Sequence, residues 1–224
     1  MKKFTFVFVI LVLAAELISV VFNMSFVEHI AKPLIMVSLM VYYLVRVSER
    51  NYFFIAALVF CWLGDVLLMF QKTEIFFIGG LIAFLTGHLL YMISYRQLRY
   101  ADSVEGLLTT QKIRLAFPIV LAGTGLVVVL LPHLGALKIP VMIYALVLSV
   151  MVIQALFRTG FTSKRSFVLI FSGAVFFMIS DSLLAINKFM QPVPMAALLI
   201  MATYMTAQFL IVEGAIDHAN HTAG

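Results

Sequence analysis

The sequence carries very little charge. Only 11% of its 224 residues are Asp, Glu, Lys or Arg, whereas soluble domains average about 25%. Hydrophobic residues make up 64% of the chain, and the mean hydropathy is +1.13. Apolar runs recur along the whole length, so the composition excludes a soluble domain and indicates a polytopic integral membrane protein. Charge sorting across a membrane explains the excess of basic residues better than nucleic-acid binding does, so no nucleic-acid partner is expected.

Cysteine is scarce, and the common catalytic motifs are missing. Cys61 is the single cysteine, which excludes an internal disulfide and any CxxC motif. Zinc usually needs three or four His, Cys or carboxylate ligands, and His88 is the only histidine well inside an apolar run. The sequence also lacks a G-x-S-x-G elbow, a P-loop and a dinucleotide fingerprint. We therefore expect neither a metal site nor a cofactor.

Eight apolar segments of roughly bilayer-spanning length alternate with short connections. They run approximately over 4–23, 32–47, 52–70, 75–95, 113–131, 138–157, 166–187 and 195–213. The first lacks a signal-peptide cleavage site, contains Glu16 and leads directly into more spans, so we expect it to be retained. The longest connection, about 101–112, contains Asp102 and Glu105 and is too short for a soluble domain. The prediction is an all-α bundle of eight transmembrane helices forming a single membrane domain, 1–224.

The basic residues indicate an orientation. If the N-terminus is cytoplasmic, eleven of them face inside: Lys2, Lys3, Arg46, Arg50, Arg96, Arg99, Lys112, Arg114, Arg158, Lys164 and Arg165. Only Lys32, Lys72, Lys138 and Lys188 then lie on the other face. An even number of spans places the C-terminus inside as well. We expect both termini in the cytoplasm and the protein in a bacterial inner membrane.

Two aspartates lie inside these apolar segments in similar contexts. Gly64-Asp65-Val66-Leu67-Leu68 resembles Ser180-Asp181-Ser182-Leu183-Leu184. A carboxylate at membrane depth costs several kcal/mol unless it is paired, hydrated or protonated, so we take both acids as candidate catalytic residues. The offset of 116 residues suggests a parallel repeat of four plus four helices, although shared packing constraints explain the similarity equally well. The alternative is that each acid bonds to a neighbouring polar side chain and holds the helices together.

Other polar side chains are expected near the same depth. The candidates for substrate binding or for support of the acids are Lys32, His88, Tyr91, Asn187, Tyr204 and Gln208. Lys32, at the expected start of the second span, suits a lipid phosphate as well as it suits the membrane interface. A lone histidine such as His88 is often a buried packing residue, and the polar neighbours make a functional role equally plausible. Asn187 lies nearly two turns beyond Asp181.

Five short motifs in order resemble the YhhN family. They are Lys32-Pro33-Leu34, Gly64-Asp65-x-Leu67-Leu68, His88-Leu89-Leu90-Tyr91, Ser180-Asp181-x-Leu183-Leu184-Ala185-x-Asn187-x-Phe189 and Tyr204-x-x-Ala207-Gln208-x-Leu210-Ile211. Their order and the eight-helix layout extend the resemblance over nearly the whole chain. Known members are lysoplasmalogenases, so the resemblance implies an ether-bond hydrolase acting on a lysophospholipid among membrane lipids. It also implies that Asp65 and Asp181 match the acids proposed as catalytic in that family.

The implied chemistry suits two carboxyls. A vinyl ether has no carbonyl to attack, and its slow step is protonation of the β-carbon, which gives an oxocarbenium ion that water captures. The hemiacetal then collapses to a fatty aldehyde and glycerophosphocholine or glycerophosphoethanolamine. A neutral carboxylic acid would donate the proton while a carboxylate stabilises the cation and activates the water. The residues alone leave open which of Asp65 and Asp181 is the acid.

Two other functions remain open from the sequence. One is a different lysolipid hydrolase, for which Ser180 is the only obvious nucleophile and lacks a visible activating histidine. The other is a proton-coupled transporter, for which two membrane acids and a repeat are natural. Broken helices at mid-membrane would favour transport, but the prolines lie near span ends or in a loop. The oligomeric state cannot be inferred.

Overall fold

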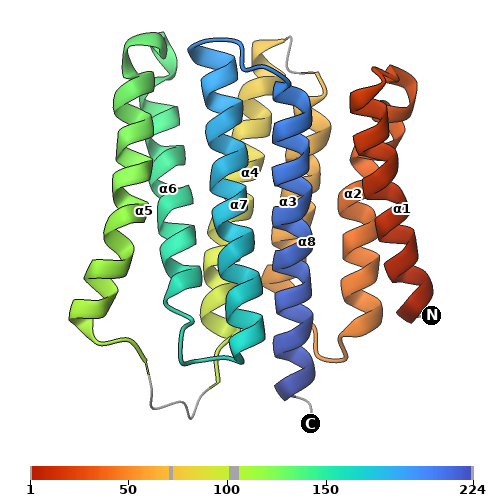
Figure 1. The fold of residues 1–224 in the computed structure, drawn as a ribbon, viewed down its shortest axis with the longest axis vertical. Helices are drawn as coiled ribbons and strands as arrows, with labels where there is room; N and C mark the ends of the chain where they lie inside the picture. Colours follow the sequence, from red (N-terminus) through yellow and green to blue (C-terminus); the bar gives the residue numbers. More distant parts are fainter. Residues whose placement is uncertain (1, 71–72, 101–105, 223–224) are drawn as a thin grey trace. The chain divides into compact units, whose positions relative to one another are not determined.

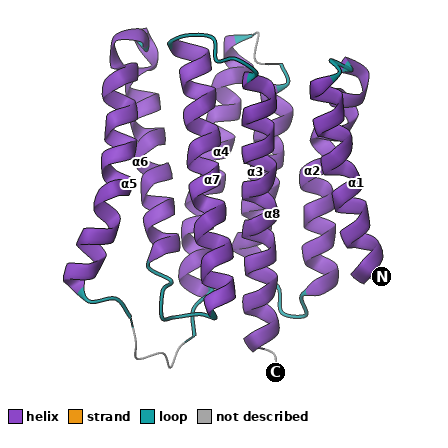
Figure 2. Cartoon of the chain, in the orientation of Figure 1, coloured by secondary structure: helices purple, strands orange, loops and turns teal. Residues whose placement is uncertain are grey.

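The structure is a computed structural model that describes residues 2–70, 73–100 and 106–222. Lys72, Asp102 and Glu105, used above to argue topology and loop length, lie outside these residues. Throughout the described ranges the chain forms helices joined by short loops and contains no strand (Figure 2). The predicted all-α class is therefore confirmed.

Eight α-helices follow one another in the part of the chain that the structure describes, as predicted. They are α1 (Lys2–Val21), α2 (Ser25–Arg46), α3 (Tyr52–Leu68), α4 (Glu74–Gln97), α5 (Thr109–Leu130), α6 (Lys138–Leu156), α7 (Lys164–Phe189) and α8 (Ala196–Thr222). Two short 3-10 turns, η1 (Leu131–His133) and η2 (Gly135–Leu137), join α5 to α6. All but α3 are long and apolar enough to cross a membrane. The 17 residues of α3 extend about 26 Å, at the lower limit for a span.

Two helix boundaries differ from the prediction. The helix expected to open at Lys32-Pro33 begins at Ser25, and Pro33 lies inside it. A proline inside a membrane helix is tolerated because neighbouring groups can satisfy the freed backbone carbonyl. At the other end of the chain, α8 continues to Thr222, beyond the expected end of the eighth span at about residue 213. Ala215, Ile216 and His218 are buried there.

The contacts within the chain divide it into two compact units. The first comprises residues 1–94 with 219–224, and the second comprises 95–218. The boundary falls where a repeat of four plus four helices would place it. The repeat, the single membrane domain and the cytoplasmic termini stay predictions.

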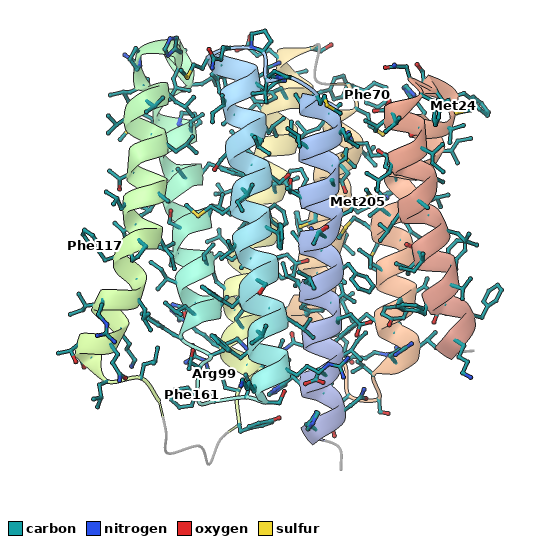
Figure 3. The ribbon with its side chains drawn as sticks, viewed as in Figure 1. Met24, Phe70, Arg99, Phe117, Phe161 and Met205 are labelled. Carbon is teal, nitrogen blue, oxygen red and sulfur yellow. The ribbon has the colours of Figure 1, made fainter. Side chains whose placement is uncertain are left out.

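In the first unit, α1 and α2 form a tight hairpin (Figure 1). Asn23 turns the chain with a φ of 53°, a left-handed conformation that Asn tolerates, and the Met24 amide donates to the Ser19 carbonyl at 2.8 Å. The next helix, α3, begins with a side-chain cap, because Asn51 accepts a hydrogen bond from the Phe54 amide at 2.9 Å. Met24, in the first turn, and Phe70, just after α3, lie at the same end of this unit (Figure 3).

In the second unit, basic residues gather at one end. This end joins the last turn of α4, the start of α5, the end of α6 and the start of α7, where seven of the residues predicted to be cytoplasmic lie. The Arg99 guanidinium lies 5.5 Å from the Phe161 ring centroid, and Lys112 lies 5.7 Å from that of Phe157 (Figure 3). Lys138 and Lys188 are at the opposite helix ends. Within this unit, the basic residues predicted to be cytoplasmic thus lie at one set of helix ends, and Lys138 and Lys188 lie at the other.

Candidate active site

Asp65 lies in the last turn of α3 and is 4% exposed. The glycine before it permits a close approach of the neighbouring helix. A Cβ atom added to Gly64 would lie 2.5 Å from a ring carbon of Phe84 on α4. Small residues allow such contacts between membrane helices. The Gly-Asp sequence therefore places Asp65 one residue from the α3–α4 contact.

Asp181 lies on α7 and is held by a tyrosine. The Tyr144 hydroxyl, on α6, donates a hydrogen bond of 2.6 Å to Asp181 Oδ2. The preceding Ser180 donates from its Oγ to the Ile200 carbonyl of α8 at 3.0 Å. In both acidic segments, then, the small residue before the aspartate contacts the next helix in the chain. This shared packing explains the Gly-Asp and Ser-Asp pattern.

Tyr144 was not among the residues singled out from the sequence. It stands alone among apolar residues, and aromatic side chains in spans are usually packing residues. A comparison of how far Tyr144 and Asp181 lie from the ends of their helices would have identified the pair. Tyr144 lies six residues after α6 begins, and Asp181 lies eight residues before α7 ends. Since the two helices are consecutive, these positions lie at about 9 and 12 Å from the same end.

Two of the other candidates in the first unit, His88 and Tyr91, lie on α4 and pack against aromatic rings. His88 is fully buried, and its ring stacks on Phe84 with centroids 6.4 Å apart. Tyr91 is also fully buried and packs against Phe54, with centroids 5.6 Å apart. Since Phe84 also lies against Gly64, His88 is linked through this ring to the residue that precedes Asp65. Lys32, on α2, is half-buried.

The candidates in the second unit divide into two groups. Tyr204 and Gln208 lie one turn apart on α8, buried, with the Gln208 amide nitrogen 3.5 Å from the Tyr204 oxygen. Phe177 lies one turn before Asp181 on α7, and its ring packs edge-on against Tyr204 with the centroids 5.5 Å apart. Asn187 has a structural role, because its Oδ1 accepts from the Val193 amide at 3.0 Å and shapes the connection to α8. The structure thus brings Tyr204, rather than Asn187, toward the turn that carries Asp181.

One aspartate belongs to each unit, and their pairing in one pocket stays a prediction. Within the described ranges, no three His, Cys, Asp or Glu side chains come together as metal ligands would. The candidate chemistry rests on the two carboxyls, with Tyr144, His88, Tyr204 and Gln208 as the other polar side chains considered.

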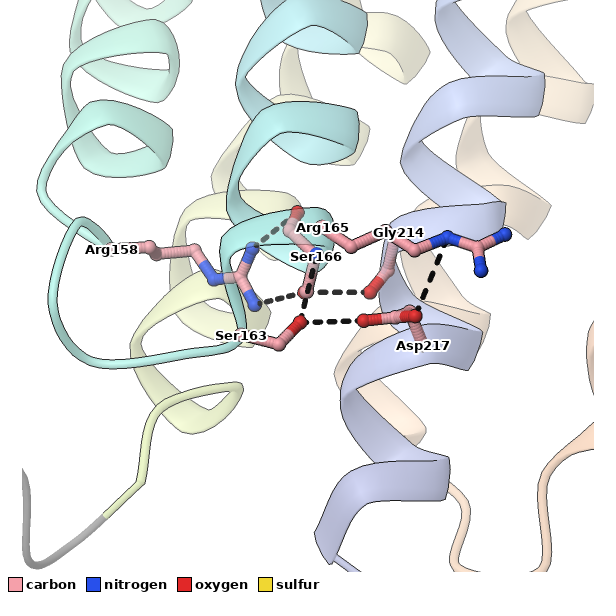
Figure 4. Close-up of polar contacts among 6 residues, drawn as sticks. All are labelled: Arg158, Ser163, Arg165, Ser166, Gly214 and Asp217. Atoms are coloured by element: carbon pink, nitrogen blue, oxygen red, sulfur yellow. Dashed lines mark hydrogen bonds and ion pairs between the residues drawn. The ribbon is translucent and has the colours of Figure 1, made fainter.

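A buried arginine cluster was also missed from the sequence. Arg158, just after α6, is fully buried and donates to the Leu98 carbonyl from Nε at 3.1 Å and from Nη2 at 2.9 Å. Nη2 also donates to Ser166 Oγ at 2.9 Å, and that hydroxyl donates to the Gly214 carbonyl at 2.7 Å (Figure 4). Burial, the largest cause, lowers the pKa of the Arg158 guanidinium to about 10. Arg158 thus links the segment after α4 to α7 by hydrogen bonds, and Ser166 links α7 to α8.

Side chains around Arg158 extend the cluster. Ser163 caps α7 by accepting from the Ser166 amide at 2.9 Å, and its hydroxyl donates to Asp217 Oδ2 at 2.5 Å (Figure 4). Arg165 approaches the same aspartate at 3.6 Å with a side chain that is 73% exposed. These contacts explain why the polar end of α8 is helical and packed. They contain no group from the predicted site, so the cluster is structural.

Comparison with known proteins decides the family. The model of the YhhN family matches residues 27–215. The chain belongs to the YhhN family. Asp65 and Asp181 both lie inside the matched region, as do the six other candidate residues. No solved structure matches the chain.

Several curated relatives are named lysoplasmalogenase. The chain is 34% identical over 161 residues to lysoplasmalogenase TMEM86B of Homo sapiens, covering 71% of this chain and 62% of the relative. It is 32% identical over 166 residues to human lysoplasmalogenase TMEM86A, covering 71% and 63%. A lysoplasmalogenase of Mycobacterium tuberculosis is 31% identical over 171 residues, covering 75% and 62%. The chain thus spans somewhat less than two thirds of the length of these relatives.

Proposed function

We propose that this YhhN-family protein is a lysoplasmalogenase that hydrolyses the vinyl-ether bond of lysoplasmalogens. The names of its relatives support the reaction, and the two membrane aspartates are the residues suited to it. The products are a fatty aldehyde and glycerophosphocholine or glycerophosphoethanolamine. A bacterial inner membrane is the proposed location, since one of the relatives is bacterial.

The reaction needs one neutral acid and one carboxylate. The neutral acid transfers its proton to the β-carbon of the vinyl ether, and the α-carbon becomes an oxocarbenium ion. Water adds to that carbon and loses a proton to the carboxylate, giving a hemiacetal. The hemiacetal collapses by breaking the bond to the glycerol oxygen, which leaves as an alcohol. Carboxyls in apolar surroundings can hold these two states at one pH.

The hydrogen bond from Tyr144 carries the proposed division of roles. An O–H donor stabilises a carboxylate, and such charge-assisted bonds are about twice as strong as neutral ones. Asp181 is therefore proposed as the carboxylate that faces the cation and takes the proton from water. Asp65 is proposed as the acid that protonates carbon. His88 and Tyr204 lie on α4 and α8, which pack against the residues that precede these two acids, and each is proposed to line the substrate path beside its acid.

An apolar groove in the second unit suits the alkenyl chain. It lies between α5 and α6, encloses about 440 Å³ and is lined by residues such as Val127, Met142 and Leu146. Ligand pockets for lipophilic molecules are mostly apolar with a few placed polar groups. The groove shares α6 with Tyr144, so we propose that the chain of the substrate lies along this helix.

An assay on purified protein tests the proposal. Lysoplasmalogen is supplied beside the ester lysolipid with the same head group, and aldehyde release is followed. Wild-type protein is expected to release aldehyde only from the vinyl ether, and Asp65→Asn and Asp181→Asn are each expected to abolish release. Full activity in either variant would refute the two-acid mechanism. Absence of aldehyde from the wild type, with substrate-driven proton flux in liposomes, would favour a transporter.

A further inference from the structure

A third carboxyl is buried in the membrane portion of the first unit. Glu16, on α1, is fully buried, and neither of its carboxylate oxygens has a hydrogen-bond partner among the described residues. The nearby Ser19 hydroxyl instead donates to the main-chain carbonyl of Glu16 at 2.8 Å. Buried carboxyls without a donor are strongly disfavoured, whereas an apolar residue at this position would have no such requirement. The Glu16 carboxyl is therefore a buried acceptor to which none of the described residues donates.

Two charged residues of α2 lie near this carboxyl across the hairpin. Glu28 and Lys32 are close enough to act on the charge of Glu16, and they lie one turn apart, on the same side of α2. Among the described residues, however, neither of them forms an ion pair with the other or with Glu16. Both are half-buried. The three groups thus lie near one another in the hairpin, and none of them pairs with another within the described ranges.

This region lies near the turn between α1 and α2. Glu16 precedes the end of α1 by five residues, and Lys32 follows the start of α2 by seven, which corresponds to depths of about 7 and 10 Å. Asp65 precedes the end of α3 by three residues. Since Met24 and Phe70 mark the same end of the unit (Figure 3), Asp65 and the three charges share that end. A lipid head group and the adjoining vinyl ether are likewise neighbours, separated only by glycerol.

We propose that Glu16, Glu28 and Lys32 bind the head group of a lysophospholipid that ends in a primary ammonium. Lys32 contacts the phosphate, and the two carboxylates accept hydrogen bonds from the ammonium. A primary ammonium carries three donors, which the oxygens of Glu16 lack, whereas a quaternary ammonium carries none. The site thus selects ethanolamine over choline. This inference rests on the proposed function, because it names the head group of the same substrate.

Binding of lipids that cannot be hydrolysed tests this site apart from catalysis. Alkyl-ether lysolipids with an ethanolamine, a choline or an unsubstituted phosphate head group are titrated into purified protein. The wild type is expected to bind the ethanolamine lipid at least tenfold more tightly than the other two. Glu16→Gln and Glu28→Gln are each expected to remove that preference while leaving affinity for the phosphate lipid unchanged. Lys32→Met is expected to weaken binding of all three.

Glu49→Gln is the matched control, because Glu49 is exposed and lies in the loop between α2 and α3. It is expected to leave every affinity unchanged. Equal affinity of the wild type for the three lipids would overturn the head-group site. So would an unchanged preference in Glu16→Gln and Glu28→Gln. A preference for ethanolamine in a protein that releases no aldehyde would support the site and refute only the proposed hydrolysis.

Discussion

The contact between Gly64 and Phe84 offers a sharp test of how the packing positions Asp65. In Gly64→Ala, the added methyl carbon would lie 2.5 to 2.9 Å from three ring carbons. Nonbonded carbons prefer about 3.5 to 4.0 Å, so the ring has to move by about 1 Å. Phe84 is only 7% exposed and has little room to do so. Such overpacking lowers the free energy of unfolding by about 1–3 kcal/mol, and the higher helix propensity of Ala offsets at most about 1 kcal/mol of this loss.

The consequence for activity is larger than that for stability. A displacement of about 1 Å in a catalytic group can cost on the order of 100-fold in rate. Gly64→Ala is therefore expected to lower the rate of aldehyde release at least about tenfold while lowering the free energy of unfolding by about 1–2 kcal/mol. Both quantities are measurable on protein in detergent micelles, by aldehyde release and by thermal unfolding.

Gly79→Ala is the control for this prediction. Gly79 lies on α4, and its added methyl would meet only Leu67 Cδ1 of α3, at an ordinary 3.5 Å. This variant is expected to keep full activity and to be at least as stable as the wild type. Equal losses in the two variants would refute the reasoning, as would full activity in Gly64→Ala.

The remaining predictions concern Tyr144 and Arg158. Tyr144→Phe removes a charge-assisted hydrogen bond worth about 1.5–3 kcal/mol, so we expect kcat to fall about 10- to 100-fold with KM unchanged, whereas the exposed Tyr52→Phe has no effect. Arg158→Met leaves the Leu98 carbonyl without its donor but relieves a buried charge. We expect a net loss of about 2 kcal/mol in unfolding free energy, against less than about 0.5 kcal/mol for the exposed Arg165→Met.

The helices were predictable because hydropathy along a single chain reports directly on membrane spans. Their ends were less so. The start of α2 was predicted at Lys32-Pro33, yet the helix begins at Ser25, because a membrane helix can accommodate an interior proline. The segment after residue 213 lay outside the expected spans, yet it is helical and packed, with Asp217 and His218 bonded to Ser163 and Thr162. Contacts between residues so distant in sequence leave no local pattern.

The site residues also divide into those that the sequence reveals and those that it does not. Asp65 and Asp181 stood out because charge is rare inside a membrane segment, and this signal needs no knowledge of neighbours. Tyr144 did not, because one tyrosine in an apolar helix resembles any packing residue until its partner is known. Arg158 was taken only as a topology marker, since its bonds to main-chain carbonyls depend on how loops meet. Residues that act through a backbone partner are the hardest to find from sequence.

Hydrolysis in heavy water tests the central claim most directly, that a membrane carboxylic acid protonates the β-carbon of the vinyl ether. The released aldehyde is trapped at once and its mass is measured. We expect one deuterium on the carbon next to the aldehyde carbon, and no product from Asp65→Asn. Aldehyde without deuterium at that carbon, or labelled aldehyde released at the wild-type rate by Asp65→Asn, would contradict it.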